Sequence, residues 1–212
     1  MSKKYSSDIN KLFSYQIAKL NEEWPQYLGE LEVSVTNEEE LIDIINNSDL
    51  GGVIEETLLD SAPVHAWRIL SLLKSSKIVG ILLEKLLEYK DATWLFIEIP
   101  LVSEKIGVES IDKNIEFLKT SDNLYVQICT INSLTLLGKK NKAKRDYIAA
   151  DMIEILEEYS FNNYTLTGYL IKALCEFKIK EAIDLINEIV DVEEFDDEII
   201  SYEEIEKFVN SF

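Results

Sequence analysis

The chain has 212 residues, 47% of them apolar, so it is long enough to bury a substantial hydrophobic core. Its 7 glycines and 3 prolines are too few for a strand-rich fold with many tight turns. The net charge of −19 opposes contact with a phosphate backbone, so we expect no nucleic acid partner. No apolar run is long enough to span a membrane and no signal-peptide core follows the N-terminus, so we expect a cytoplasmic protein without membrane contact.

The negative charge is concentrated near the two ends. Residues 1–60 carry 4 basic and 13 acidic side chains, a net charge of −9, whereas residues 61–180 carry 16 and 15, a net charge of +1. Residues 181–212 carry 1 basic and 12 acidic side chains, a net charge of −11. Acidic ends would attract a basic partner and speed the encounter. They are equally typical of terminal repeats that keep a polar outer face in solution.

Residues 1–60 are predicted to form N-terminal capping helices. These helices are expected at residues 6–20, 26–33, 37–45 and 53–59. The first is expected to end before Trp24-Pro25, because proline cannot donate the hydrogen bond that would continue it. The third is expected to begin with a capping box, in which Asn37 and Glu40 each bond the backbone of the other residue.

Residues 61–90 contain the clearest helix pair. Pro63 favours a helix start with Ser61 as N-cap, because the N–H that proline lacks has no partner in the first helical turn. Two apolar stripes at helical spacing follow, separated by a Ser-Ser-Lys turn. They consist of Val64, Trp67, Leu70 and Leu73, and of Ile78, Ile81, Leu82, Leu86 and Tyr89. Neither stripe can be buried within the pair alone, which is the signature of a helical solenoid.

Three further pairs are predicted from starts near residues 92, 123 and 163. In the second pair, Pro100 is expected to kink the first helix because it has no N–H to donate. In the third, Asn123 is expected to cap the first helix and Gly138 to end it. A solvated turn rich in cations is expected next. Its cations are Lys139, Lys140, Lys142, Lys144 and Arg145.

The C-terminal residues 191–212 are predicted to form an acidic loop and a closing helix, which a capping box of Ser201 and Glu204 begins. The whole chain, 1–212, is thus predicted to be one all-α domain. Its architecture would be an α-α superhelix, a right-handed solenoid of antiparallel helix pairs of the HEAT and armadillo type. Residues 61–190 would supply about four HEAT-like pairs, with capping segments on either side.

The succession of short helix pairs over about residues 60–190 resembles the HEAT-like repeat superfamily, in the short-repeat variety related to bilin-lyase-type repeats. The stretch 63–68, Pro-Val-His-Ala-Trp-Arg, is also similar to one in uncharacterised bacterial HEAT-repeat proteins. Some of those proteins carry a Cys/His zinc tail. This chain departs from that pattern, since it has one histidine and no clustered cysteines. The resemblance implies a binding scaffold in a bacterial cytoplasm and brings with it no catalytic residue.

No motif predicts a catalytic, cofactor-binding or metal site. His65 is the only imidazole and, at a helix start, is expected to be a packing or capping residue. Cys129 and Cys175 fall in helical stripes and are expected to be reduced core residues; with His65 they are too few for a structural zinc site. The acidic run 193–198 lacks the glycine and the ligand spacing of a calcium loop. The cations of residues 139–145 are expected to be solvated.

Repeated helix pairs without site chemistry favour a non-enzymatic scaffold that binds another protein and leave its oligomeric state open. The acidic ends favour a basic partner, such as the toxin that an inhibitor or immunity protein would block. The alternative is a ligand-binding or bilin-lyase-like enzyme that uses the concave groove. The residues expected at the partner surface are His65, Arg68, Trp94, Glu98, Tyr164, Glu193, Glu194, Asp196 and Asp197.

Overall fold

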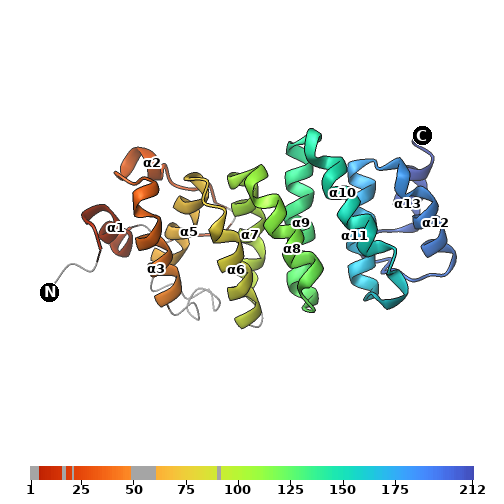
Figure 1. Ribbon diagram of the computed structural model, residues 1–212, viewed down its shortest axis with the longest axis horizontal. Helices are drawn as coiled ribbons and strands as arrows, with labels where there is room; N and C mark the ends of the chain where they lie inside the picture. Colours follow the sequence, from red (N-terminus) through yellow and green to blue (C-terminus); the bar gives the residue numbers. More distant parts are fainter. Residues whose placement is uncertain (1–4, 16–17, 21, 49–60, 90–91) are drawn as a thin grey trace. The chain divides into compact units, whose positions relative to one another are not determined.

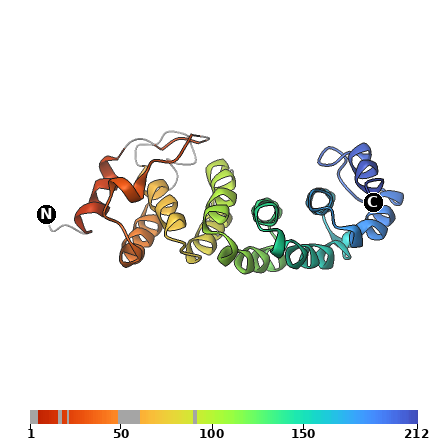
Figure 2. The same ribbon diagram turned by 90° about the horizontal axis from the view of Figure 1, so that it is seen from above.

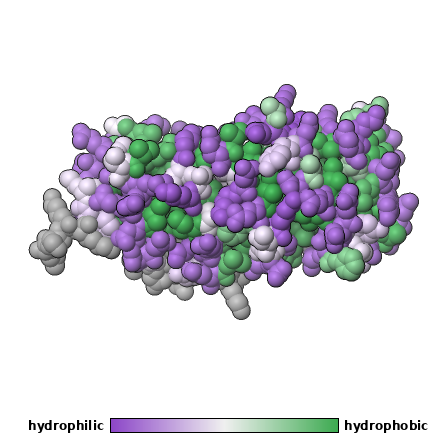
Figure 3. Space-filling view, viewed as in Figure 1, coloured by the Kyte–Doolittle hydropathy of each residue, from purple (hydrophilic) through white to green (hydrophobic). Residues whose placement is uncertain are grey.

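The computed structural model describes residues 5–15, 18–20, 22–48, 61–89 and 92–212 (Figure 1). Every regular element in these ranges is a helix and none is a strand, which confirms the predicted all-α class. None of the described helices is both long and apolar enough to cross a bilayer. On the face that Figure 3 shows, hydrophilic side chains lie between smaller groups of hydrophobic ones. The helix predicted at 53–59 lies outside the described residues. The chain divides into two compact units, Met1–Ser110 (unit 1) and Ile111–Phe212 (unit 2).

The N-terminal part of unit 1 is made of short helices. They are α1 (Ser7–Lys11), α2 (Tyr27–Glu30), α3 (Glu38–Asn47) and 3-10 turns at Leu12–Ser14 and Val35–Asn37. The prediction of one helix over 6–20 was wrong, because the helical backbone ends at Ser14 and Tyr15 is extended. A contact distant in sequence accounts for the difference: the N–H of Ala18 donates to the hydroxyl of Ser61 at 2.9 Å. The N–H of Ala18 therefore bonds the residue before α5 rather than a carbonyl within a helical turn.

The capping box before α3 is shifted by three residues from its predicted position. Ser34 and Asn37 form the box: the Ser34 hydroxyl accepts from Thr36, and the Asn37 side chain accepts from the Ser34 N–H at 3.0 Å. Glu40 does not bond the backbone of Asn37; its carboxylate accepts from the Asn37 side chain at 3.1 Å and from the N–H and the hydroxyl of Ser6 at 2.7 and 2.8 Å. The predicted partner of Asn37 thus anchors the start of α1 to α3.

The predicted helix pair of residues 61–90 is confirmed as α5 (Ala62–Leu72) and α6 (Lys77–Glu88). Pro63 lies in the first turn of α5, and most of the two apolar stripes is buried, while Leu73, Ile81 and Tyr89 are half-buried. α7 (Thr93–Ile106) follows and continues through Pro100; the kink expected there stays a prediction. Within unit 1, α5 packs against α3 and α7, and α6 packs against α7 (Figure 1).

Unit 2 consists of helices joined by short connections. They are α8 (Ile111–Thr120), α9 (Leu124–Lys140), α10 (Lys142–Leu156), α11 (Tyr164–Phe177), α12 (Ile183–Asp191) and α13 (Tyr202–Val209). α9 packs against both α8 and α11, while α10 packs against α8, α9 and α11. Seen from above in Figure 2, α9 and α11 lie in one layer of this unit, and α8 and α10 lie in the other.

Two helix starts in unit 2 follow their predicted caps. The side chain of Asn123 accepts from the N–H groups of Tyr125 and Val126. Ser201 and Glu204 form the predicted capping box of α13. These two predictions succeed because each cap depends only on residues two or three positions away. Asn163, near which the fourth pair was expected to begin, also caps its helix, since its side chain accepts from Thr165.

Gly138 does not end α9, contrary to the prediction. The helix continues to Lys140, and a Cβ atom on Gly138 would lie 2.3 Å from Cζ of Phe177 on α11. Gly138 is therefore needed for the close approach of two helices rather than for a left-handed turn. The cation-rich turn is also shorter than expected, since only Asn141 separates α9 from α10. Its cations thus lie on helix ends, and Arg145 donates to the carbonyl of Phe177 at 3.3 Å.

The predicted acidic loop before α13 is confirmed as non-helical, but it is folded onto the unit. Phe195 and Ile200 are buried, and the N–H of Asp196 donates to the carbonyl of Tyr164 at 3.1 Å. The Asp196 carboxylate accepts from the Thr165 hydroxyl and from the N–H of Glu198. The loop is therefore held against the start of α11 by its own acidic residue.

Both cysteines are free thiols in unit 2, Cys129 on α9 and Cys175 on α11. Burial raises the pKa of Cys129 well above its ordinary value. Burial, with smaller effects of Glu204 and Glu176, raises the pKa of Cys175 to about 12.

At about pH 8 we therefore expect both thiols of the native protein to react with iodoacetamide at least about 100-fold more slowly than in denaturant, because the thiolate is the nucleophile. Mass spectrometry of timed samples measures both rates; native labelling at the denatured rate would contradict the buried placement.

Candidate functional site

Unit 1 holds a buried ion pair between α5 and α7. The side chains of Arg68 and Glu98 are 2% and 1% exposed. Two parallel bonds join them: Arg68 Nε donates to Glu98 Oε2 at 3.0 Å, and Nη2 donates to Oε1 at 2.5 Å. The indole N–H of Trp67 also donates to Glu98, at 3.1 Å. Burial lowers the pKa of Arg68, but the bonds to Glu98 and its charge outweigh this effect and raise the pKa, so the guanidinium stays charged.

His65, one turn before Arg68 on α5, completes this network. Its Nδ1 lies 2.6 Å from the hydroxyl of Tyr27 in α2, and the ring of Tyr15 packs edge-on against the imidazole with centroids 5.0 Å apart. Burial raises the pKa of Tyr27 well above its ordinary value against an opposing effect of Arg68, so the phenol stays neutral. The only histidine of the chain is thus enclosed by aromatic rings, as expected for a packing residue.

Two residues that precede α2, Lys19 and Trp24, contact this network at Arg68. The carbonyl of Lys19 accepts from Arg68 Nη2 at 3.1 Å. Trp24 lies over the same guanidinium, 5.2 Å from ring centroid to Cζ, and Lys105 Nζ lies 5.8 Å from the same centroid. The buried pair therefore positions the chain that carries Trp24 and its neighbours.

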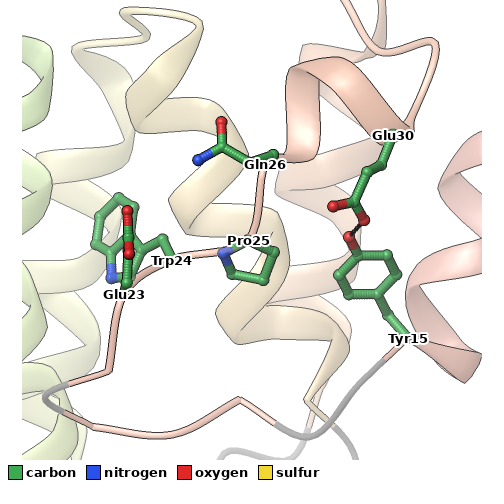
Figure 4. Close-up of a pocket in the computed structure, with 6 residues that line it drawn as sticks. All are labelled: Tyr15, Glu23, Trp24, Pro25, Gln26 and Glu30. Carbon is green, nitrogen blue, oxygen red and sulfur yellow. Dashed lines mark hydrogen bonds between the residues drawn. The ribbon is translucent and has the colours of Figure 1, made fainter.

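Three cavities of about 420, 490 and 280 Å³ lie around residues 18–19 and 22–30 of unit 1, and Glu23 and Pro25 border all of them. The first, which we name the acidic cavity, is lined by Tyr15, Glu23, Trp24, Pro25, Gln26 and Glu30. Figure 4 shows Glu23 and Trp24 on one side of it, Tyr15 and Glu30 on the other, and Pro25 and Gln26 between them. The Tyr15 hydroxyl donates to the Glu30 carboxylate. Burial, and then this carboxylate, raise the pKa of Tyr15 to about 12.

Acidic side chains line all three cavities. Four carboxylates line them, those of Glu22, Glu23, Glu30 and Glu104. The cations among the lining residues are Lys19, Arg68 and Lys105, and Arg68 is neutralised by Glu98. In the acidic cavity itself the charged lining residues are all carboxylates. Among the described residues, no group of three or more His, Cys, Asp or Glu side chains is arranged to hold a metal ion.

The nine residues expected at a partner surface fall into two groups. His65, Arg68, Trp94 and Glu98 are buried in unit 1, although His65 and Arg68 border the third cavity. Three of them are joined in one network, since His65 bonds Tyr27, Tyr27 bonds Arg68 and Arg68 bonds Glu98. The residues of the second group lie in unit 2. Tyr164, Glu193 and Asp197 are exposed there, while Glu194 and Asp196 are half-buried.

Sequence reasoning missed the residues that line the acidic cavity. The sequence pattern predicts only a helix end at Trp24-Pro25 and gives no role to the glutamates before it. One signal is present: a tryptophan that follows two glutamates and precedes a proline is a large apolar side chain in a connection that has no helical stripe to bury it. Comparisons of the chain with protein-family models, curated proteins and solved structures find no match.

Proposed function

We propose that the chain is a non-enzymatic scaffold for protein–protein interaction in the cytoplasm, of the HEAT-repeat type, and that its partner is basic. In this proposal the helix pairs continue into an α-α superhelix. The observation that carries the basic partner is the set of carboxylates around the cavities of unit 1, in a chain with a net charge of −19. Surface charge of one sign attracts a partner of the opposite sign and excludes others.

Two further features support a binding role rather than catalysis. The Nδ1 atom of His65 is engaged by Tyr27, and this imidazole is buried. The buried ion pair of Arg68 and Glu98 satisfies its own charges and fixes the connection above it. An acidic inhibitor or immunity protein would use a surface of this kind against a nucleic-acid-binding toxin, whose active face must be basic.

Salt provides the test of this proposal. The whole chain, used as an affinity bait in its native cytoplasmic extract, should retain a partner, and calorimetry should give the Kd of the purified complex. We expect the Kd to rise at least about tenfold between about 0.05 and about 0.5 M salt, because exposed charges are screened over shorter distances as ionic strength rises. A complex whose Kd does not change with salt would contradict the basic partner, and recovery of no partner would contradict the scaffold.

A further inference from the structure

We propose that the acidic cavity of unit 1 receives the guanidinium group of an arginine side chain from the protein partner. This inference rests on the proposed function and names the group that the partner inserts. The cavity has a volume of about 420 Å³, within the range of small-ligand pockets and ample for one side chain. Its residues belong to α2, to the connection before it and to the residue after the first 3-10 turn, all within unit 1.

The charges of the cavity select a cation. Glu23 and Glu30 lie on opposite sides of it (Figure 4), and among the described residues neither carboxylate has an ion-pair partner. Glu30 is oriented by the Tyr15 hydroxyl, which occupies only part of its hydrogen-bonding capacity. A cation placed between the two carboxylates would meet an attraction from each side, whereas an anion would be repelled by both.

The shape of the site favours arginine over lysine. Guanidinium has five N–H donors in one plane and pairs with a carboxylate through two parallel bonds, while an ammonium group is a compact point charge. The half-buried rings of Trp24 and Pro25 offer an apolar wall for the methylene stem. The Trp24 ring already lies near Arg68 and Lys105, so the attraction for a further cation comes from the carboxylates rather than from this ring.

The surroundings keep the site open and in place. Gln26 and Glu30 are exposed, so the cavity is accessible from solvent. The buried network below it, in which Arg68 holds the Lys19 carbonyl, fixes the connection that carries Glu23 and Trp24. An entering side chain therefore meets groups that are already positioned, which lowers the entropy cost of binding.

The test uses the whole chain labelled with fluorotryptophan and two pentapeptides, Gly-Gly-Arg-Gly-Gly and its citrulline counterpart, both blocked at the termini. Citrulline has nearly the shape of arginine but no charge. The chain has three tryptophans, Trp24, Trp67 and Trp94, so fluorine NMR should give three resonances that Trp→Phe variants assign. We expect the arginine peptide to shift the Trp24 resonance saturably and to leave those of the buried Trp67 and Trp94 in place. The citrulline peptide should shift none of them.

Two variants of equal charge complete the experiment. Glu23→Gln with Glu30→Gln removes both carboxylates of the cavity, and Glu84→Gln with Glu109→Gln removes two exposed glutamates of unit 1 that do not line it. We expect the first to weaken the arginine peptide at least about tenfold and the second less than about twofold. Equal weakening by both variants, an equal shift by citrulline, or no shift by arginine would overturn the assignment.

Binding of the cellular partner distinguishes this proposal from the proposed function. Binding that is sensitive to salt but unaffected by the cavity variant would overturn this site and leave the proposed function standing.

Discussion

Replacing Glu98 by glutamine is expected to lower the free energy of unfolding of unit 1 by about 3–5 kcal/mol. The substitution keeps the shape of the side chain and removes its charge, so Arg68 would remain buried as an uncompensated cation. Burying an unpaired charge costs far more than an ion pair contributes, because water no longer solvates it and no carboxylate replaces the water. The loss should therefore be large although only one atom of the side chain has changed.

The three tryptophans make this loss measurable in unit 1 alone, since all of them lie within Met1–Ser110. Urea unfolding followed by tryptophan fluorescence gives the free energy of the unit that contains the pair. Glu88→Gln is the matched control: Glu88 pairs with Lys85 at 3.3 Å but is 59% exposed, so the change should be less than about 1 kcal/mol. A double variant, Arg68→Met with Glu98→Leu, should recover most of the lost stability. If Glu98→Gln cost no more than the control, the pair would not be buried as described.

Replacing Gly138 by alanine is expected to destabilise unit 2 by about 1–3 kcal/mol. The new methyl group would lie 2.3 Å from Cζ and 2.7 Å from Cε1 of the Phe177 ring. That ring is buried and carries Arg145 on its face, 5.7 Å from Cζ to centroid, so it cannot move aside without disturbing the contact between α9 and α11. The higher helix propensity of alanine, about 1 kcal/mol, offsets only part of this cost.

Gly29 provides the matched control for this substitution. It lies in α2, and a Cβ atom there would have no heavy atom within 4 Å. Gly29→Ala should therefore change the stability by less than about 1 kcal/mol, in the stabilising direction. Thermal unfolding followed by far-UV circular dichroism compares the two variants. Phe177→Leu, added to Gly138→Ala, should cost less than the two single changes together, because the smaller side chain makes room for the methyl group. Equal melting temperatures for the two alanine variants would contradict the close approach.

The sequence predicts those parts of the fold that depend on neighbours along the chain. Asn123 and Ser201 cap helices as expected, because a capping side chain bonds an N–H two or three residues away. The buried stripes of α5 and α6 also follow from helical periodicity. The predictions that fail depend on residues distant in sequence: Ala18 bonds Ser61, and Gly138 is fixed by Phe177.

The candidate site shows the same division. The sequence predicts His65, Arg68 and Glu98 at a partner surface. In the structure Arg68 pairs with Glu98, 30 positions away, and both side chains are buried. The acidic cavity combines residues that no local pattern links, since Tyr15 follows one helix and Glu30 ends another. The sequence alone does not distinguish the charged residues of the buried network from the exposed glutamates of the cavity. The difference arises from the packing of α5 against its neighbours.

Hydrogen–deuterium exchange on the complex with the captured partner tests the central claim most directly. We expect peptides that cover residues 22–30 to exchange more slowly when the partner is bound, and this protection to disappear when salt is raised, because the contact is electrostatic. An acidic or neutral partner, or protection that persists at high salt, would contradict a scaffold that binds its partner through carboxylates.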